Sequence, residues 1–204
     1  MAASSSPVKM IDFSRHQFSP VIQLPADYEV YDFTAGYDPD RKRSSPYGIG
    51  KYNEVRKNMY TTALFGNERN IHMGIDISAP VGEPIKSFYD GEVFSFAYNA
   101  APGDYGHTLI IRHVIDGIDL YALYGHLNAA STADKTVGQK VRAAEVIAWV
   151  GDKHENGGWN PHLHLQLSYE RPLVCDMPGA VSAANREKAL LTYPDPQLVL
   201  GKLY

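Results

Sequence analysis

The sequence predicts a mainly β protein: a compact antiparallel β-sandwich or barrel-sandwich hybrid with an irregular N-terminal extension and a C-terminal helix. Three observations predict this fold class. Short apolar segments alternate with polar residues from residue 71 onward, turn-forming pairs separate these segments, and a clear helix-forming stretch occurs only near the end of the chain. A chain of 204 residues, 44% of them apolar, can bury such a core as one domain with extensions.

Residues 1–58 are predicted to form an irregular extension that packs its tyrosines on the core. Proline and glycine interrupt every periodic stretch of this segment. A short helix over residues 52–62 has weak support from the pattern. Residues 59–175 then form the β domain, and residues 176–204 form the C-terminal helix and tail.

Within the β domain, residues 71–78 show the strand pattern most clearly. Four apolar side chains share one face of this predicted strand: Ile71, Met73, Ile75 and Ile77. Further strands are expected at residues 91–98, 107–113, 120–126, 145–150 and 162–169, with turn pairs at 90–91, 102–103, 116–117 and 137–138. The Ala, Arg, Glu, Lys and Leu residues of 180–191 predict the C-terminal helix.

Composition and charge argue against several functions. A formal net charge of −4 and a pI near 6.0 provide no general attraction to nucleic acid or anionic membranes. No apolar run approaches the roughly 18 residues that span a bilayer, so membrane insertion is not expected. The single cysteine, Cys175, cannot form an intrachain disulfide and lacks a neighbouring base to activate it. No secretory signal is visible, so a cytoplasmic location is expected unless a signal has been removed, and the oligomeric state is not predicted.

The first of three histidine clusters contains His72 and Asp76. On a straight strand these side chains would share a face but lie roughly 13 Å apart, too far to bind one ion. The chain must therefore bend between them, and Gly74 is the residue that permits the bend. Taken alone, the pair is better explained as two polar surface residues.

The second cluster is His162-Leu163-His164, and the third is a lone His126 at a strand end. Residues two apart on a strand point the same way, so both imidazoles of the second cluster enter one cavity. One ring can bind a metal while the other handles protons. Each cluster alone also fits an ordinary surface or strand-end histidine.

Together these segments resemble a known family. The sequence contains His-x3-Asp at residues 72–76, Tyr-Gly-His-Leu at 124–127, Val-Gly-Gln-Lys-Val at 137–141 and His-Leu-His at 162–164. In this order, over about residues 68–170, they resemble the lysostaphin/LytM-like zinc endopeptidases of the duplicated hybrid motif fold. The ordered set is much more specific than any one segment.

The resemblance implies that His72, Asp76 and His164 are zinc ligands, and that His126 and His162 serve proton transfer and transition-state stabilisation, in roles that the sequence does not divide between them. Two neutral imidazoles and one carboxylate leave zinc a net positive charge and a free fourth position, as in catalytic sites. The implied substrates are glycine- or D-amino-acid-rich peptides of peptidoglycan cross-bridges. These lie outside the cytoplasm, whereas the sequence shows no export signal. Neither an inhibitory role for the extension nor an asparagine ligand is assigned.

Two alternatives stay open at this point. The same fold could hold zinc as a binding or regulatory module without catalysis, although all five positions of the pattern are filled, which favours activity. A biotinyl/lipoyl-type carrier is the other alternative, but Lys86 and Lys140 lack the setting of a modifiable lysine. His107 and His113, outside the pattern, are expected to have packing or surface roles.

Overall fold

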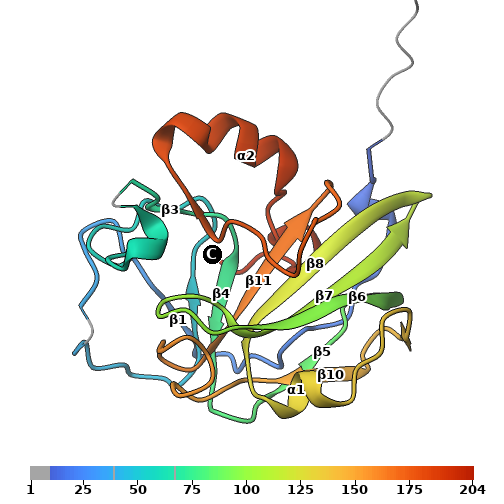
Figure 1. Cartoon of the computed structure of the whole chain (residues 1–204), viewed down its shortest axis with the longest axis horizontal. Helices are drawn as coiled ribbons and strands as arrows, with labels where there is room; N and C mark the ends of the chain where they lie inside the picture. Colours follow the sequence, from blue (N-terminus) through green and yellow to red (C-terminus); the bar gives the residue numbers. More distant parts are fainter. Residues whose placement is uncertain (1–9, 39, 67) are drawn as a thin grey trace, which may run out of the picture.

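The centre of the molecule is an eight-stranded sheet. The computed structural model describes residues 10–38, 40–66 and 68–204 (Figure 1). In sheet order the strands are β1 (Glu29–Val30), β2 (Gly48–Gly50), β4 (Ile75–Ser78), β11 (His162–Ser168), β8 (Ile118–Leu127), β7 (Gly106–Ile115), β6 (Gly91–Asn99) and β9 (Lys140–Val141). Neighbouring strands are antiparallel except β1 and β2, which are parallel. The predicted mainly β fold class is therefore confirmed, as an open sheet.

The longest hairpin shows how the sequence specifies this sheet. Asp116 and Gly117 join β7 to β8 with φ angles of 53° and 75°. A two-residue hairpin turn with two positive φ angles matches the twist of the flanking strands, and Asp-Gly is among the pairs that tolerate it best. The turn predicted at residues 116–117 fixes the register of the two strands that lead to His126.

Two smaller sheets complete the fold. β5 (Pro84–Lys86) pairs with β10 (Val146–Trp149), and β3 (Ile71–His72) pairs with β12 (Ala180–Val181). Apolar side chains of β5 and β10 share one buried cluster with those of β7 and β8, so this small sheet covers one face of the large one. Burial of these apolar side chains is the main source of stability for such a two-layer arrangement.

The extension is part of the sheet rather than an appendage to it. β2 pairs with β4, and tyrosines 28, 47 and 52 pack against the main core. The hydroxyls of Tyr28 and Tyr52 donate to the carbonyls of Leu203 and Tyr193, at 2.9 and 2.5 Å. These bonds attach the extension to the C-terminal segment. Residues 1–9 of the predicted extension lie outside the described residues.

The helices differ most from the predictions. No α-helix forms at residues 52–62, where Asn53 and Asn58 adopt positive φ angles of 55° and 58°, which an α-helix does not allow. The helix predicted at residues 180–191 begins later, because Ala180 and Val181 instead pair with β3. The helical elements are η1 (Phe13–Arg15), η2 (Ala63–Phe65), α1 (Ala130–Ala133), η3 (Ala183–Asn185), α2 (Arg186–Thr192) and α3 (Gln197–Leu200). Within the described residues, no helix combines the length and hydropathy needed to cross a membrane.

Candidate metal centre

The predicted straight strand at residues 71–78 is broken into β3 and β4 at Met73 and Gly74, which brings His72 and Asp76 to the same place. Gly74 is needed for a different reason from the predicted one. Gly74 does not have a positive φ angle, but a Cβ there would lie 2.5 Å from Cε1 and Nε2 of His164. The missing side chain therefore makes room for the imidazole of His164.

Strand pairing supplies the third member of this group. β11 runs antiparallel to β4, and His164 is the residue directly opposite Asp76. Directly opposed side chains on one face of a sheet lie close together. His72, Asp76 and His164 thus form a cluster whose ligand atoms all lie within 4.8 Å of one another, which we call the triad.

The triad atoms form a nearly regular triangle. Nδ1 of His164 lies 3.0 Å from both Nε2 of His72 and Oδ1 of Asp76, and the third side measures 3.2 Å. A tetrahedral zinc site with bonds of about 2.0–2.1 Å separates its ligands by about 3.3 Å. The triangle therefore fits one face of such a tetrahedron to within a few tenths of an ångström.

The hydrogen bonds on the outer sides of the His72 and His164 rings show that the triad suits a cation. Nδ1 of His72 lies 2.9 Å from the carbonyl of Lys51, and Nε2 of His164 lies 3.1 Å from Oε1 of Gln166. Each of these nitrogens faces an oxygen acceptor and so carries the ring proton, which leaves the lone pairs of both rings directed at Asp76 and at each other. Three electron-pair donors in mutual contact fit a divalent cation between them.

Arg56, which the sequence did not single out, holds the other oxygen of the triad carboxylate. Its Nη1 donates to Oδ2 of Asp76 at 2.6 Å, and the arginine side chain is 2% exposed. Burial raises the pKa of Asp76, but His72, Arg56 and His162 outweigh it and hold this pKa well below its ordinary value. The carboxylate is therefore ionised at neutral pH. No local signal identified Arg56, because its partner lies 20 residues away in the sequence.

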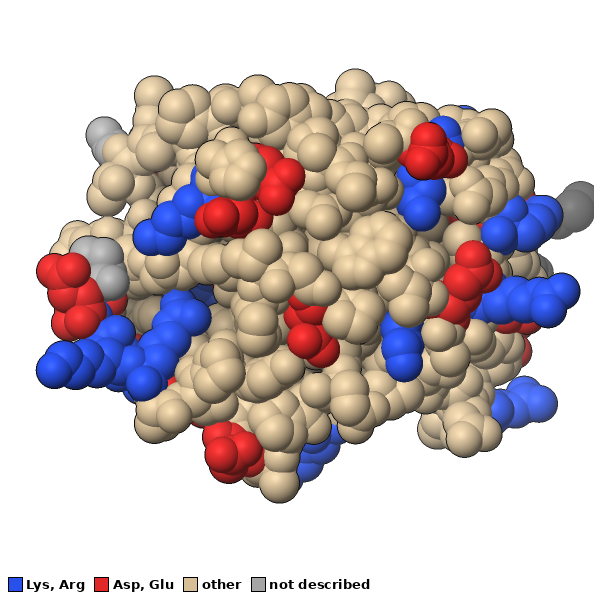
Figure 2. All heavy atoms as spheres, turned by 90° about the horizontal axis from the view of Figure 1, so that it is seen from below, with Lys and Arg blue, Asp and Glu red and all other residues tan. Residues whose placement is uncertain are grey.

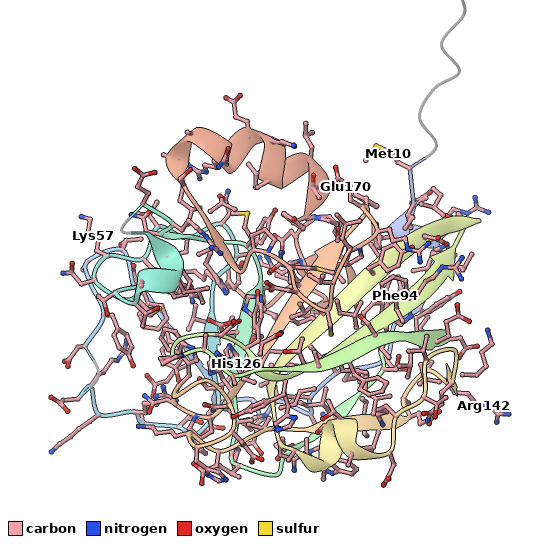
Figure 3. The ribbon with its side chains drawn as sticks, in the orientation of Figure 1. Met10, Lys57, Phe94, His126, Arg142 and Glu170 are labelled. Atoms are coloured by element: carbon pink, nitrogen blue, oxygen red, sulfur yellow. The ribbon has the colours of Figure 1, made fainter. Side chains whose placement is uncertain are left out.

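His126 and His162 lie beside the triad with their rings 4.3 Å apart. Nδ1 of His126 donates to the carbonyl of Asn156 at 2.8 Å, and Nδ1 of His162 donates to the carbonyl of Asn160 at 2.6 Å. The Nε2 atom of each ring is thus left as an acceptor. Burial, followed by His162 and His164, lowers the pKa of His126 well below its ordinary value, and burial also lowers the pKa of His162. Both rings are neutral at pH 7, and Figure 3 shows His126 in the interior of the molecule.

His126 owes its position to an unusual backbone and to a loop. Its φ angle is 64°, which few residues other than glycine adopt. Asn156, fully buried in the loop after β10, accepts hydrogen bonds from Gly158 and Trp159 and donates to the carbonyls of Gly151 and Trp159. These bonds set the loop conformation, and so they aim the Asn156 carbonyl at the ring of His126.

All five of these side chains line one cavity that is open to solvent. The extension supplies part of its wall: Tyr31, Phe33, Tyr37, Arg43 and Arg56. The face shown in Figure 2 is hollowed beside a group of Lys and Arg side chains at its left end. A cavity with an apolar wall and a few convergent polar groups is typical of a site for a small molecule or a peptide.

The other histidines, the cysteine and the lysine that the sequence brought into question do not line this cavity. His107 stacks on Tyr98 with ring centroids 4.4 Å apart, and His113 is fully buried against Phe88. Burial raises the pKa of Cys175 to about 11, so its thiol is protonated at neutral pH. Lys140 forms a salt bridge with Glu92.

The comparisons with known proteins agree on one family. The model of peptidase family M23 matches residues 70–174. The DD-carboxypeptidase/endopeptidase Mpg of Neisseria meningitidis serogroup B is 38% identical over 131 residues, which cover 58% of this chain and 28% of that protein. The murein hydrolase activator NlpD of Salmonella dublin is 32% identical over 106 residues, which cover 52% of this chain and 25% of that protein. This chain thus spans less than a third of each of these two relatives.

A solved structure shows a weaker likeness. The catalytic domain of the prophage-encoded M23 protein EnpA from Enterococcus faecalis, solved as a point mutant, is 26% identical, with a TM-score of 0.47. The alignment covers 69% of this chain and 92% of that domain.

Proposed function

The chain belongs to peptidase family M23, and on that basis we propose that it is a zinc-dependent endopeptidase. Its substrates are peptidoglycan cross-bridges or related peptides of glycine and D-amino acids. The single observation that carries this proposal is the shared cavity, in which a triad with inward lone pairs lies beside two neutral histidines. A purely structural zinc site has four protein ligands and no need of further bases.

The triad would hold the zinc ion, with His72, Asp76 and His164 as its ligands. When bound there, zinc acidifies a water molecule to a pKa of about 7 and polarises the scissile carbonyl. The outward hydrogen bonds of His72 and His164 keep each ring in the tautomer that presents its lone pair to the ion.

His126 and His162 would manage the proton and the developing negative charge. A neutral imidazole with a free Nε2 accepts a proton, and the imidazolium so formed then donates to an oxyanion or to the leaving amine. Each Nδ1 is already committed to a backbone carbonyl, so only Nε2 of each ring is available for these roles.

The relatives' names support the substrate class. Mpg is named as a DD-carboxypeptidase and endopeptidase. NlpD, in contrast, is named as an activator of murein hydrolases. A zinc-binding module that regulates another hydrolase is therefore the second candidate function.

One experiment separates the two candidates. Zinc stoichiometry is measured alongside release of soluble fragments from cross-linked peptidoglycan and cleavage of a glycine-peptide panel, for wild type and His162→Ala. His154→Ala is the matched control, because that histidine side chain is 76% exposed and outside the cavity. We expect one zinc per chain in all three proteins, with hydrolysis lost by about 10²–10⁴-fold only in His162→Ala. Stoichiometric zinc without cleavage of any peptide by the wild type would instead identify the regulatory module.

A further inference from the structure

We propose that Arg43 is a binding residue for a carboxylate of the substrate, located one or two residues from the bond that is cleaved. This inference rests on the proposed function and specifies which peptides the same cavity takes. Arg43 belongs to the extension, outside the family match, and its side chain lines the cavity that contains the triad.

The position of Arg43 relative to the triad follows from strand β4. Its Nη1 donates to Oγ of Ser78 at 3.3 Å. Ser78 is two residues from Asp76 on the same face of β4, and it lies directly opposite His162 in the sheet. Arg43 is therefore anchored at the His162 side of the triad.

The charge of Arg43 is held in place without being neutralised. Arg41 and Arg43 both lie over the ring of Tyr31, each with its guanidinium carbon 5.3 Å from the ring centroid. Arg41 is paired with Glu29 at 3.0 Å, but within the described part of the chain no carboxylate forms a salt bridge with Arg43. A guanidinium has five N–H donors, so most of those on Arg43 are left for a ligand.

Distances along an extended peptide select the carboxylate that can reach this arginine. Residues two apart on a strand are separated by roughly 6.6 Å, which sets the scale of the distance from the triad to Ser78. An extended peptide advances about 3.3–3.6 Å per residue. A carboxylate one or two residues from the scissile carbonyl is therefore the group within reach, and a planar carboxylate is the ligand that an arginine fork binds best.

The test compares peptide acids with the corresponding amides. Pentaglycine and a short peptide ending in D-Ala-D-Ala are prepared as free C-terminal carboxylates and as carboxamides. Dissociation constants are measured by calorimetry with zinc-loaded protein in a His162→Ala background, so that turnover does not interfere. The variants are Arg43→Gln, Arg43→Lys and Arg41→Gln, the last being the matched control because Arg41 contacts the same ring but does not line the cavity.

We expect the acid of at least one peptide to bind about tenfold more tightly than its amide when Arg43 is present. The ratio of the amide's dissociation constant to that of the acid should fall to about one in Arg43→Gln and stay near tenfold in Arg41→Gln. In Arg43→Lys it should lie between these two values. Raising the salt concentration should also reduce the ratio, because the charges lie at an open surface. A ratio near one for both peptides with Arg43 intact, or an unchanged ratio in Arg43→Gln, would overturn the inference. Failure of the proposed function has a different signature: the wild type cleaves nothing although the acid preference persists.

Discussion

Arg56 and Asp76 form a buried ion pair in which Nη1 of the arginine lies 2.6 Å from Oδ2 of the carboxylate. Oδ1 of the same carboxylate faces both imidazoles of the triad. The arginine thus fixes the orientation of the carboxylate and leaves Oδ1 available to the proposed zinc ion.

Replacing Arg56 with Met should weaken zinc binding by about 10–100-fold, because groups that orient a metal ligand have effects of this size. The measurement is competition for zinc with a chelator of known affinity. Arg56→Lys should restore part of the affinity, since the charge is kept while the fork is lost.

Arg69→Met is the control for the loss of a cavity arginine. Arg69 donates to the backbone carbonyls of Leu64 and Ala180, and its side chain forms no hydrogen bond or salt bridge with the described triad side chains. Equal zinc affinities for Arg56→Met and the wild type would show that Asp76 is positioned by other contacts.

Gly74→Ala should displace the imidazole of His164. The added Cβ would come within 2.5 Å of the ring and 2.8 Å of the carbonyl oxygen of Leu165, which cannot move without disturbing β11. We expect at least a tenfold loss of zinc affinity together with a lower melting temperature of the zinc-free protein. Unchanged zinc affinity would mean that β3 shifts as a unit to make room.

Asn156→Ala should impair catalysis while sparing the metal. The substitution removes the amide that organises the loop around residue 156, and each buried partner left unsatisfied costs about 1–3 kcal/mol. The carbonyl that accepts from His126 would lose its fixed direction. The expected result is full zinc stoichiometry with hydrolysis reduced by at least tenfold, checked by metal analysis and steady-state rates. Loss of zinc in this variant would contradict the separation of the two roles.

His113 should make the protein less stable in mild acid. Burial lowers the pKa of His113 to about 4. In the unfolded chain a histidine has a pKa of about 6.5, so below that pH the unfolded state binds more protons than the folded state. The contribution of His113 to stability is therefore fully present above pH 6.5 and is lost progressively as the pH falls toward 4. Between pH 7.5 and 5.0 this one residue should account for about 2 kcal/mol of lost stability.

The check is urea unfolding of wild type and His113→Phe at both pH values. Phenylalanine fills a similar volume beside Phe88 and does not titrate, so the loss between the two pH values should be about 2 kcal/mol smaller in the variant. Other buried histidines contribute equally to both proteins. Identical losses would show that His113 titrates normally in the folded state.

Much of this architecture could be predicted from local patterns. The alternation in residues 71–78 and 162–169 and the turn at 116–117 depend on side-chain periodicity and on turn chemistry, which the sequence displays directly. The convergence of His72, Asp76 and His164 was expected from the resemblance, and their role as zinc ligands stays a prediction.

What could not be predicted depends on long-range contacts. Val181 pairs with Ile71 across 110 residues, and this pairing overrides the helical preference of its segment. Arg56 has no periodic or motif signal, because only the folded sheet brings it to Asp76. Tertiary contacts of this kind override local propensity in many proteins.

The joining of β2 to β4 and of β12 to β3 limits how this protein can be divided. A fragment trimmed to residues 70–174 would expose one free backbone edge on β4 and another on β3. Bare strand edges recruit other chains and promote aggregation. Transplanting this unit into a fusion protein therefore requires both flanking segments as well as the matched core.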